Sequence, residues 1–158
     1  MPRGRGHASV CREVSAMARI SPRDETLAMR LGRAFEDLTA AGVVSAYLFG
    51  SHAEGRSHRE SDIDVGVLLR RDVHPTRKER FEARVQLSSR LEGGAVDVVV
   101  LNDAPPQLAR RIVTSGRRIF CGDAAADHAF VRDVQLRAAD VEPFLRRTRR
   151  VKLGAIVR

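Results

Sequence analysis

The sequence predicts a layered α/β (α+β) domain, because short apolar runs typical of strands alternate with segments of helical spacing along most of the chain. A chain of 158 residues has the size of one domain and can bury a substantial core. Its apolar fraction of 43% is ordinary for a globular protein. We therefore expect a single domain over residues 21–158, ending in a basic helical tail, after a flexible basic N-terminus over residues 1–20.

The first half of the chain predicts one long helix and two strands. The helix begins at Pro22, since proline suits the first helical position and acidic residues occupy the first turn. Apolar residues then recur at helical spacing until Gly42 ends the segment. The apolar run 43–49 predicts the first strand, and a short helix is expected to begin at Ser51. A polar loop follows, and residues 61–69 predict the second strand.

A second long helix is predicted over residues 75–91, followed by a third strand. The buried face of this helix is expected to carry the apolar residues Phe81, Val85 and Leu87. The run 95–101 is apolar and rich in β-branched residues, which is typical of a strand buried on both faces.

The last part of the chain predicts a helix, a short strand and a final helix. A Pro-Pro pair begins the first of these helices, which ends at Gly116. Residues 117–120 predict a short strand at the edge of the sheet. From Asp123 onward the pattern is helical, and Pro143 is expected to break or kink this helix.

The most informative motif is a turn at Gly50 and Ser51, followed by a polar loop and then by Asp62-Ile63-Asp64. On a strand, this spacing places Asp62 and Asp64 on one face, because side chains alternate with a period of two. Burying two unpaired carboxylates is costly, and a divalent cation removes the cost. Oxygen ligands of this kind suit Mg²⁺, which is commonly shared with substrate phosphates. The motif therefore predicts a Mg²⁺ site and a phosphorylated substrate.

Ser51 has two interpretations at the start of the predicted short helix. Its hydroxyl and the following amides would face an incoming phosphate, aided by the helix dipole. It can equally serve as an ordinary helix N-cap. The Asp-x-Asp motif downstream favours the functional interpretation. We leave His52 and His58, in the same loop, out of the predicted site.

Asp97 lies alone inside an apolar run, where an unpaired aspartate gains nothing from burial. If the third strand lies beside the second, Asp97 joins Asp62 and Asp64, and three carboxylates are enough for a two-metal site. Taken singly, each has a structural alternative: Asp62 as a turn residue or cap, Asp64 as the partner of a buried arginine, and Asp97 as a cap. Their combination with the Gly-Ser turn favours the metal site.

These residues resemble the signature of the minimal nucleotidyltransferases of the DNA polymerase β-like superfamily, above all the prokaryotic members paired with HEPN ribonuclease toxins. The resemblance implies a small mixed sheet with helices packed mainly on one face. It implies that Gly50 and Ser51 hold a triphosphate and that Asp62 and Asp64 bind two Mg²⁺ ions. It also implies that Asp97 binds one ion and helps to deprotonate an acceptor hydroxyl.

The resemblance covers about residues 22–122 and has one departure. Many relatives have an arginine near the second glycine of the loop, where this chain has Ala53-Glu54-Gly55. Glu54 would repel phosphate. Either Arg56 takes over the binding of the nucleotide, or the nucleotide binds more weakly than usual.

The activity implied by the resemblance is the Mg²⁺-dependent transfer of AMP from ATP to a hydroxyl of a HEPN toxin, with tyrosine as the expected acceptor. The added negative charge would block RNA at the toxin, so the protein would act as an antitoxin. One alternative is an antitoxin that works by stoichiometric binding, which the substitution Asp62→Asn would spare. A less favoured alternative is an antibiotic-modifying nucleotidyltransferase, for which the chain leaves little room for an added helical domain.

Charge and hydropathy limit the partners. The net charge of +8 favours anionic partners, and basic residues are densest over residues 144–152. This stretch predicts a surface for RNA or a protein partner, or simply a solvated helix end. Direct RNA binding stays open, although no aromatic residues alternate with the arginines. No stretch has membrane-spanning length and no signal peptide is visible, so we expect a cytoplasmic protein with no membrane contact.

Overall fold

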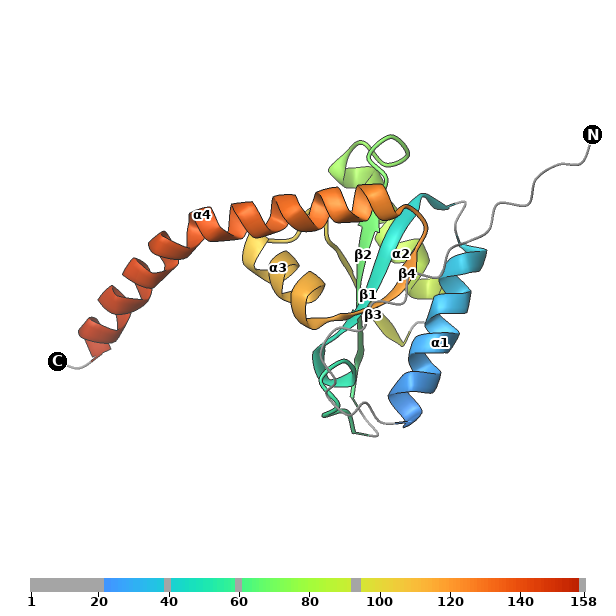
Figure 1. The fold of residues 1–158 in the computed structure, drawn as a ribbon, viewed down its shortest axis with the longest axis horizontal. Coiled ribbons are helices and arrows are strands. Elements are labelled where there is room, and N and C mark those ends of the chain that lie inside the picture. The colour runs from blue at the N-terminus through green and yellow to red at the C-terminus, as the bar shows by residue number, and fades with distance from the viewer. Residues whose placement is uncertain (1–21, 39–40, 59–60, 92–94, 157–158) are drawn as a thin grey trace, which may run out of the picture.

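The computed structural model describes residues 22–38, 41–58, 61–91 and 95–156, so the N-terminal segment predicted over residues 1–20 lies outside the described residues. Figure 1 shows a central sheet flanked by helices. In chain order the elements are α1 (Pro22–Asp37), β1 (Val43–Phe49), a 3₁₀ turn (Gly50–His52), β2 (Ile63–Leu69), α2 (Arg77–Arg90), β3 (Val96–Val100), α3 (Pro106–Ser115), β4 (Arg117–Cys121) and α4 (Ala124–Ile156). Among the described helices, none is both long and apolar enough to cross a membrane.

The sheet is mixed, as predicted, with the strand order β3-β2-β1-β4. β1 lies at the centre and runs antiparallel to both β2 and β4, whereas β2 and β3 are parallel. β4 is an edge strand, which confirms that prediction, and β3 forms the other edge. The parallel pair matters most for the site, because it places the third predicted strand directly beside the second.

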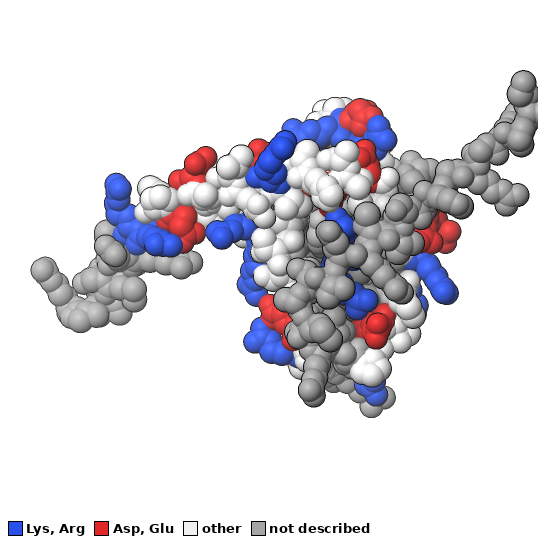
Figure 2. Space-filling view, in the orientation of Figure 1, with Lys and Arg blue, Asp and Glu red and all other residues white. Residues whose placement is uncertain are grey.

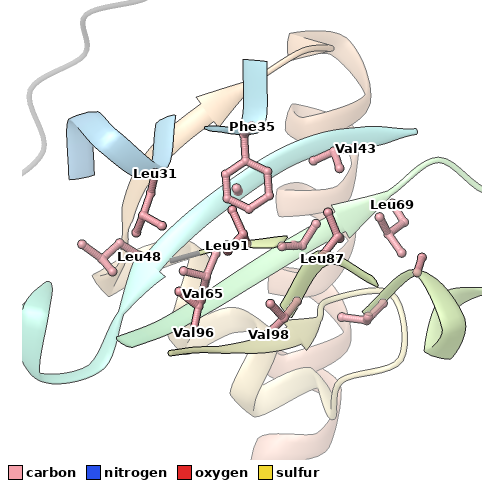
Figure 3. Close-up of a cluster of buried hydrophobic side chains, with 14 of the residues drawn as sticks. Leu31, Phe35, Val43, Leu48, Val65, Leu69, Leu87, Leu91, Val96 and Val98 are labelled. Carbon is pink, nitrogen blue, oxygen red and sulfur yellow. The ribbon is translucent and has the colours of Figure 1, made fainter. Parts of the chain in front are cut away.

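Helices cover both faces of the sheet, so the expectation that they pack mainly on one face is wrong. On one face, α1 and α2 contribute Leu31, Phe35 and Leu87 to a core cluster with residues of all three strands from β1 to β3 (Figure 3). On the other face, α3 and α4 pack through Ile112 and Phe130 against β1 and β2. The reason is that β1 is apolar on both sides, with every residue from 43 to 48 buried, and such a strand needs cover on each face.

The buried face of α2 differs from the prediction. Leu87 is buried, but Phe81 and Val85 are 58% and 53% exposed. The face that meets the sheet carries Arg80 and Ala83, which lie seven and four residues before Leu87 and so share its side of the helix. The sequence pattern was misleading because the core-facing positions hold a small residue and an arginine instead of large apolar residues.

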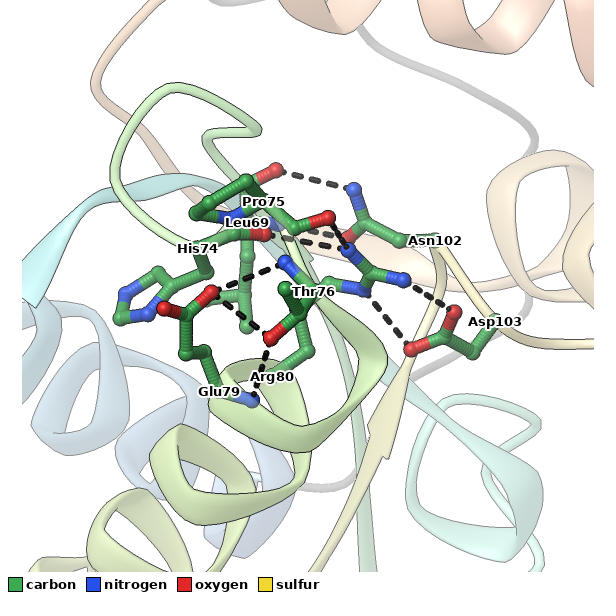
Figure 4. Close-up of polar contacts among 8 residues, drawn as sticks. All are labelled: Leu69, His74, Pro75, Thr76, Glu79, Arg80, Asn102 and Asp103. Carbon is green, nitrogen blue, oxygen red and sulfur yellow. Dashed lines mark hydrogen bonds and ion pairs between the residues drawn. The ribbon is translucent and has the colours of Figure 1, made fainter.

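Arg80 is buried because it holds two loops together (Figure 4). Its guanidinium donates to both carboxylate oxygens of Asp103 at 2.8 and 2.7 Å, and to the backbone carbonyls of His74 and Pro75 at 3.1 and 2.9 Å. In the same region, the Asn102 side chain accepts from the backbone N–H of Leu69 and donates to its carbonyl, both at 2.9 Å. These contacts tie the loop after β2 to the loop after β3, and so stabilise the pairing of the two strands.

α4 is anchored to the sheet by Asp127, which is fully buried. Its carboxylate accepts from Ser45 Oγ at 2.6 Å and from the Tyr47 hydroxyl at 2.8 Å, both on β1. It also accepts from Arg118 Nη1 on β4 at 2.8 Å. Burial, followed by the hydrogen bond to Asp127, raises the pKa of Tyr47 far above its usual range. One buried carboxylate therefore joins α4 to two strands.

The C-terminal half of α4 extends away from the sheet (Figure 1). The helix continues past Pro143, so the proline does not break it, and the α4 ribbon curves along its length (Figure 1). Arg146 and Arg147 are exposed on this projecting part, where Figure 2 shows both basic and acidic side chains. Arg146 donates to Glu142 at 3.1 Å. The side chains of residues 149–152, the rest of the predicted basic stretch, lie outside the described residues.

Candidate functional site

The Gly-Ser turn lies directly against the Asp64 carboxylate. β1 ends at Phe49, which is paired with Asp64 of β2, and Gly50 follows with a φ of +69°. A Cβ atom at this glycine would stand only 2.5 Å from an Asp64 carboxylate oxygen. Glycine is therefore required here for two reasons: the backbone is left-handed, and the Asp64 carboxylate leaves no room for a Cβ atom. The motif recognised in the sequence is thus a real contact in the fold.

The short helix predicted at Ser51 is only a 3₁₀ turn, Gly50–His52. The backbone continues to curl after it, with Glu54 N–H donating to Gly50 O at 3.1 Å and Arg56 N–H donating to Ser51 O at 3.0 Å. A single turn has little of the dipole of a full α-helix, so the expected help from a helix dipole is not available at Ser51. The left-handed conformations of Gly50 and Gly55 explain why the chain turns back instead of forming a helix.

Two carboxylates are neighbours at the start of β2 and β3, and a third lies two residues before one of them in the sequence. Asp64 and Asp97 are paired directly in the parallel register, and Asp62 precedes β2 by one residue instead of lying on it. Asp64 is partly buried, and Asp62 is exposed. Burial raises the pKa of Asp64, and the negative charges of Asp97 and Asp62 raise it further, while His52 acts in the opposite direction. Asp64 is therefore beside Asp97 in the sheet, and the charges of Asp97 and Asp62 make its ionisation less favourable.

Asp97 is not buried on both sides, contrary to the prediction for its strand. β3 is an edge strand, and Asp97 is exposed between the buried residues Val96 and Val98. Arg84 of α2 reaches this edge, where its Nη2 donates to Asp97 Oδ1 at 3.1 Å and its Nε donates to Val98 O at 2.6 Å. Nothing in the sequence pattern pointed to Arg84, because the contact depends on how α2 packs beside β3.

The chemistry of the donor set fits a hard cation. Carboxylate oxygens are the ligands that Mg²⁺ prefers, and the raised pKa of Asp64 marks negative charge that a cation would neutralise. In the described part of the chain, however, no group of three or more His, Cys, Asp or Glu side chains is arranged to hold a metal ion as it stands. Arg84 occupies one oxygen of the Asp97 carboxylate, Oδ1, so this group already has a positively charged neighbour.

The loop that follows the Gly-Ser turn is anchored to α1 through Asp24, which is only 2% exposed. The Asp24 carboxylate pairs with His52 Nδ1 at 2.7 Å and accepts from Ser57 Oγ at 2.8 Å. His52 Nε2 also lies 3.3 Å from the carbonyl of Ser61, next to Asp62. Nothing in the sequence pointed to this anchor, because an acid in the first turn of a helix is normally explained by the helix dipole alone.

Glu54 is neutralised by arginine from two sides. Its carboxylate pairs with Arg56 in the same loop and accepts from Arg111 Nη2 of α3 at 3.3 Å. Two cations therefore balance one carboxylate, and the loop as a whole is not repulsive to phosphate. Arg56 is mostly exposed and is held by Glu54, while Arg111 is a neighbour of this loop that the sequence did not reveal.

A cavity of about 570 Å³ lies away from the carboxylates, between the segment 68–72 and α4. It is at the C-terminal end of β2, whereas Asp64 is near the beginning of that strand. At a rise of roughly 3.3 Å per residue, the two places are on the order of 15 Å apart. The cavity is therefore separate from the carboxylate site.

A Gly-Ser turn packed against strand carboxylates in a small mixed sheet is the arrangement expected of a nucleotidyltransferase. Residues 37–125 match the family described as polymerase beta, nucleotidyltransferase. This match covers more than half of the chain, which therefore belongs to the polymerase beta nucleotidyltransferase family. The fold class and the family inferred from the sequence, that of a minimal nucleotidyltransferase, are both confirmed.

Individual relatives are similar over different lengths. The protein adenylyltransferase MntA of Shewanella oneidensis is 38% identical over 74 residues, which are 47% of this chain and 51% of that protein. The chain thus aligns with about half the length of this relative. One chain of a crystal structure of a toxin–antitoxin with AMP-PNP is 26% identical, with a TM-score of 0.54 over 80% of this chain and 98% of that chain.

A third comparison shows the fold alone. A chain from the rebuilt structure of the tri-AMPylated Shewanella oneidensis HEPN toxin in complex with its MNT antitoxin is 22% identical. Its TM-score is 0.51, over 85% of this chain and 99% of that chain.

Proposed function

We propose that this protein is a Mg²⁺-dependent nucleotidyltransferase that transfers AMP from ATP to a hydroxyl of a partner protein. The observation that carries the proposal is the close approach of Gly50 to the Asp64 carboxylate, which is paired with Asp97 in the sheet. The charges of Asp97 and Asp62 both raise the pKa of Asp64, which supports a site for a cation. A relative named protein adenylyltransferase supports the choice of AMP. A similar chain found in a toxin–antitoxin with AMP-PNP supports an adenine nucleotide as the donor.

In this proposal, Gly50 and Ser51 hold the triphosphate, and Arg56 adds positive charge from the same loop. Asp62 and Asp64 would hold two Mg²⁺ ions, and Asp97 would hold one of them. Bound Mg²⁺ would neutralise charge on the attacking and leaving oxygens. Asp97 accepts the proton of the acceptor hydroxyl, whose oxygen forms a bond to the α-phosphorus as the bond to pyrophosphate breaks.

The partner we propose is a HEPN-family toxin encoded nearby, with a tyrosine as the acceptor. Each transferred AMP adds a phosphate charge to the toxin surface, which would repel RNA from its ribonuclease site. The protein would then be an antitoxin that acts in the cytoplasm. The similar chain from a toxin–antitoxin structure supports a toxin as the partner.

A second candidate is an antitoxin that neutralises the toxin by binding alone. The ion pair between Arg84 and Asp97 favours it, because a guanidinium bound to one oxygen of this carboxylate competes with a metal ion for its charge. Both candidates use the same partner, and they differ only in whether the carboxylates are needed.

Label transfer from α-³²P-ATP to the protein encoded by the neighbouring gene tests the proposal. With Mg²⁺, we expect wild-type protein to label this partner, and we expect no label with Asp62→Asn or after removal of Mg²⁺ by EDTA. A tight complex without label would support the binding-only candidate. The absence of both label and complex would contradict the two candidates together.

His52 is expected to matter although it was left out of the predicted site. The substitution His52→Ala removes a hydrogen bond to the buried Asp24 carboxylate and loosens the loop that follows Ser51. Hydrogen bonds to charged groups contribute about 1.5–3 kcal/mol, so we expect the Kd for AMP-PNP to rise roughly tenfold. Titration calorimetry measures this, with His58→Ala, an exposed residue of the same loop, as the matched control. Equal affinity of His52→Ala and wild type would contradict the role of the anchor.

A further inference from the structure

An apolar groove of about 260 Å³ follows the outer edge of β3, between α2 and the beginning of α3. Its lining includes Phe81, Val99, Pro105 and Leu108. Phe81 is 58% exposed and Leu108 is 37% exposed. Val85, one helical turn after Phe81, is also exposed and extends this apolar surface along α2. Large apolar side chains exposed around a groove are typical of a surface that binds a partner.

The groove is suited to side chains and not to an added strand. An edge strand can pair with another chain through its free backbone groups. At β3, however, α2 already occupies two of the outward carbonyls: Arg84 donates to Val98 O at 2.6 Å, and Ser88 Oγ donates to Val96 O at 2.7 Å. Binding at this edge would therefore depend on apolar side chains that a partner inserts into the groove.

The charge at the rim favours an acidic partner. The rim carries Arg77 and Arg84, together with the carboxylate of Asp103. Both carboxylate oxygens of Asp103 accept hydrogen bonds from the Arg80 guanidinium. Asp97 pairs with Arg84 in turn, so Arg77, Arg80 and Arg84 together outnumber the two carboxylates. The net charge beside the groove is positive and would complement an acidic group next to the inserted side chain.

Arg84 connects the groove to the carboxylate site. Arg84 is one of the residues that line the groove, and its guanidinium donates to Asp97 at 3.1 Å. A partner in the groove therefore lies next to Asp97, and an acidic group on that partner would compete with Asp97 for Arg84. Such competition would release the third carboxylate only when a partner is in place.

We propose that this groove docks the polypeptide that carries the acceptor hydroxyl, through an apolar or aromatic side chain flanked by an acidic residue. The proposal rests on the transfer function proposed above and adds to it the surface that selects the acceptor. It also assigns Arg84 as a positioning residue. Arg84 holds Asp97 until an acidic group of the acceptor segment takes the place of Asp97 on the guanidinium.

The test uses full-length protein with Phe81→Ser or Leu108→Ser, and Leu136→Ser as the matched control. Leu136 is 63% exposed on α4 and lies outside the groove. The probe is the protein encoded by the neighbouring gene, and its affinity is measured by titration calorimetry without ATP. We expect both groove variants to raise the Kd for this protein at least tenfold, with no change in the control. The affinity for AMP-PNP and the melting temperature should stay near the wild-type values in all three.

Label transfer separates failure of the groove from failure of the transferase. If wild type binds the probe without labelling it, and the groove variants lose binding, the result supports docking in the groove and contradicts the transfer function. Groove variants that bind as tightly as wild type would overturn the groove. Failure of wild type to bind the probe would overturn it as well. Self-association of wild type that Phe81→Ser abolishes would identify a second copy of the chain as the occupant, and would equally overturn the proposal.

Arg84→Gln tests the positioning role, because it should change KM for the partner protein and kcat in different ways. It removes the competitor of Asp97 and one positive charge of the rim. We expect a higher KM for the partner protein and a kcat that is not reduced. A reduced kcat with an unchanged KM would overturn the assignment of Arg84.

Discussion

Asp64→Asn is expected to abolish nucleotide transfer and, at the same time, to raise the melting temperature of the metal-free protein. Transfer fails because the amide removes the central carboxylate of the proposed metal site, and we expect a loss of at least about 100-fold. Stability rises because burial and the charges of Asp97 and Asp62 make ionised Asp64 unfavourable in the folded state. For a partly exposed group this gain is roughly 0.5 kcal/mol, or about 2 °C.

The pH dependence of the gain follows from the direction of the pKa shift. The pKa of Asp64 is raised above its ordinary value of 3.8, so the folded state holds this proton more tightly than the unfolded state. Ionisation therefore destabilises the folded wild type at neutral pH. Below pH 3.8, Asp64 is protonated in both states, and the stability difference between variant and wild type should vanish. Thermal unfolding between pH 3 and pH 7, without metal, measures this.

Asp72→Asn is the matched control for Asp64→Asn. Asp72 is exposed and paired with Arg70 at 2.7 Å, and this hydrogen bond lowers its pKa. The same chemical change should therefore not raise the melting temperature, and transfer should be unaffected. If Asp64→Asn lowered the melting temperature of the metal-free protein, the repulsion among the three carboxylates would not be a property of the folded state.

The strands and the carboxylate motif could be predicted because they depend on local sequence. β1 has the predicted bounds, since a continuous apolar run is followed by a glycine that must adopt a positive φ. The pairing of Asp64 with Asp97 needed one further condition, that the third strand lies beside the second. The residue pattern itself suggested that condition, because an aspartate inside an apolar strand needs a reason to be there.

The features that the sequence did not reveal depend on which elements become neighbours. Arg84 and Arg111 are ordinary exposed helix residues until α2 and α3 bring them to Asp97 and Glu54. Asp24 meets His52 only because α1 packs beside the loop after β1. The face of α2 was mispredicted for the same reason, since its exposed apolar residues belong to a surface groove and not to the core. Contacts between side chains distant in sequence leave no periodic signal.

Asp127→Asn is expected to be the most destabilising single substitution considered. The wild-type carboxylate accepts from Ser45, Tyr47 and Arg118, and it is fully buried. An amide presents two N–H donors in place of one acceptor oxygen and leaves the Arg118 guanidinium without a counter-charge. Breaking a buried ion pair in this way costs about 3–5 kcal/mol, which corresponds to a fall in melting temperature on the order of 10 °C.

Tyr47→Phe separates the hydrogen bond from the ion pair and tests the network by pH. It removes one donor while Ser45 and Arg118 still satisfy Asp127, so the loss should be only about 1 kcal/mol. Because the pKa of Tyr47 is raised in the folded state, wild type should lose stability as the pH rises above about 10, where the unfolded tyrosine ionises. Tyr47→Phe should lack this part of the alkaline loss. Chemical denaturation at pH 7 and pH 11 measures both effects. If Asp127→Asn lowered the free energy of unfolding no more than Tyr47→Phe does, the buried ion pair would not be what holds α4 to the sheet.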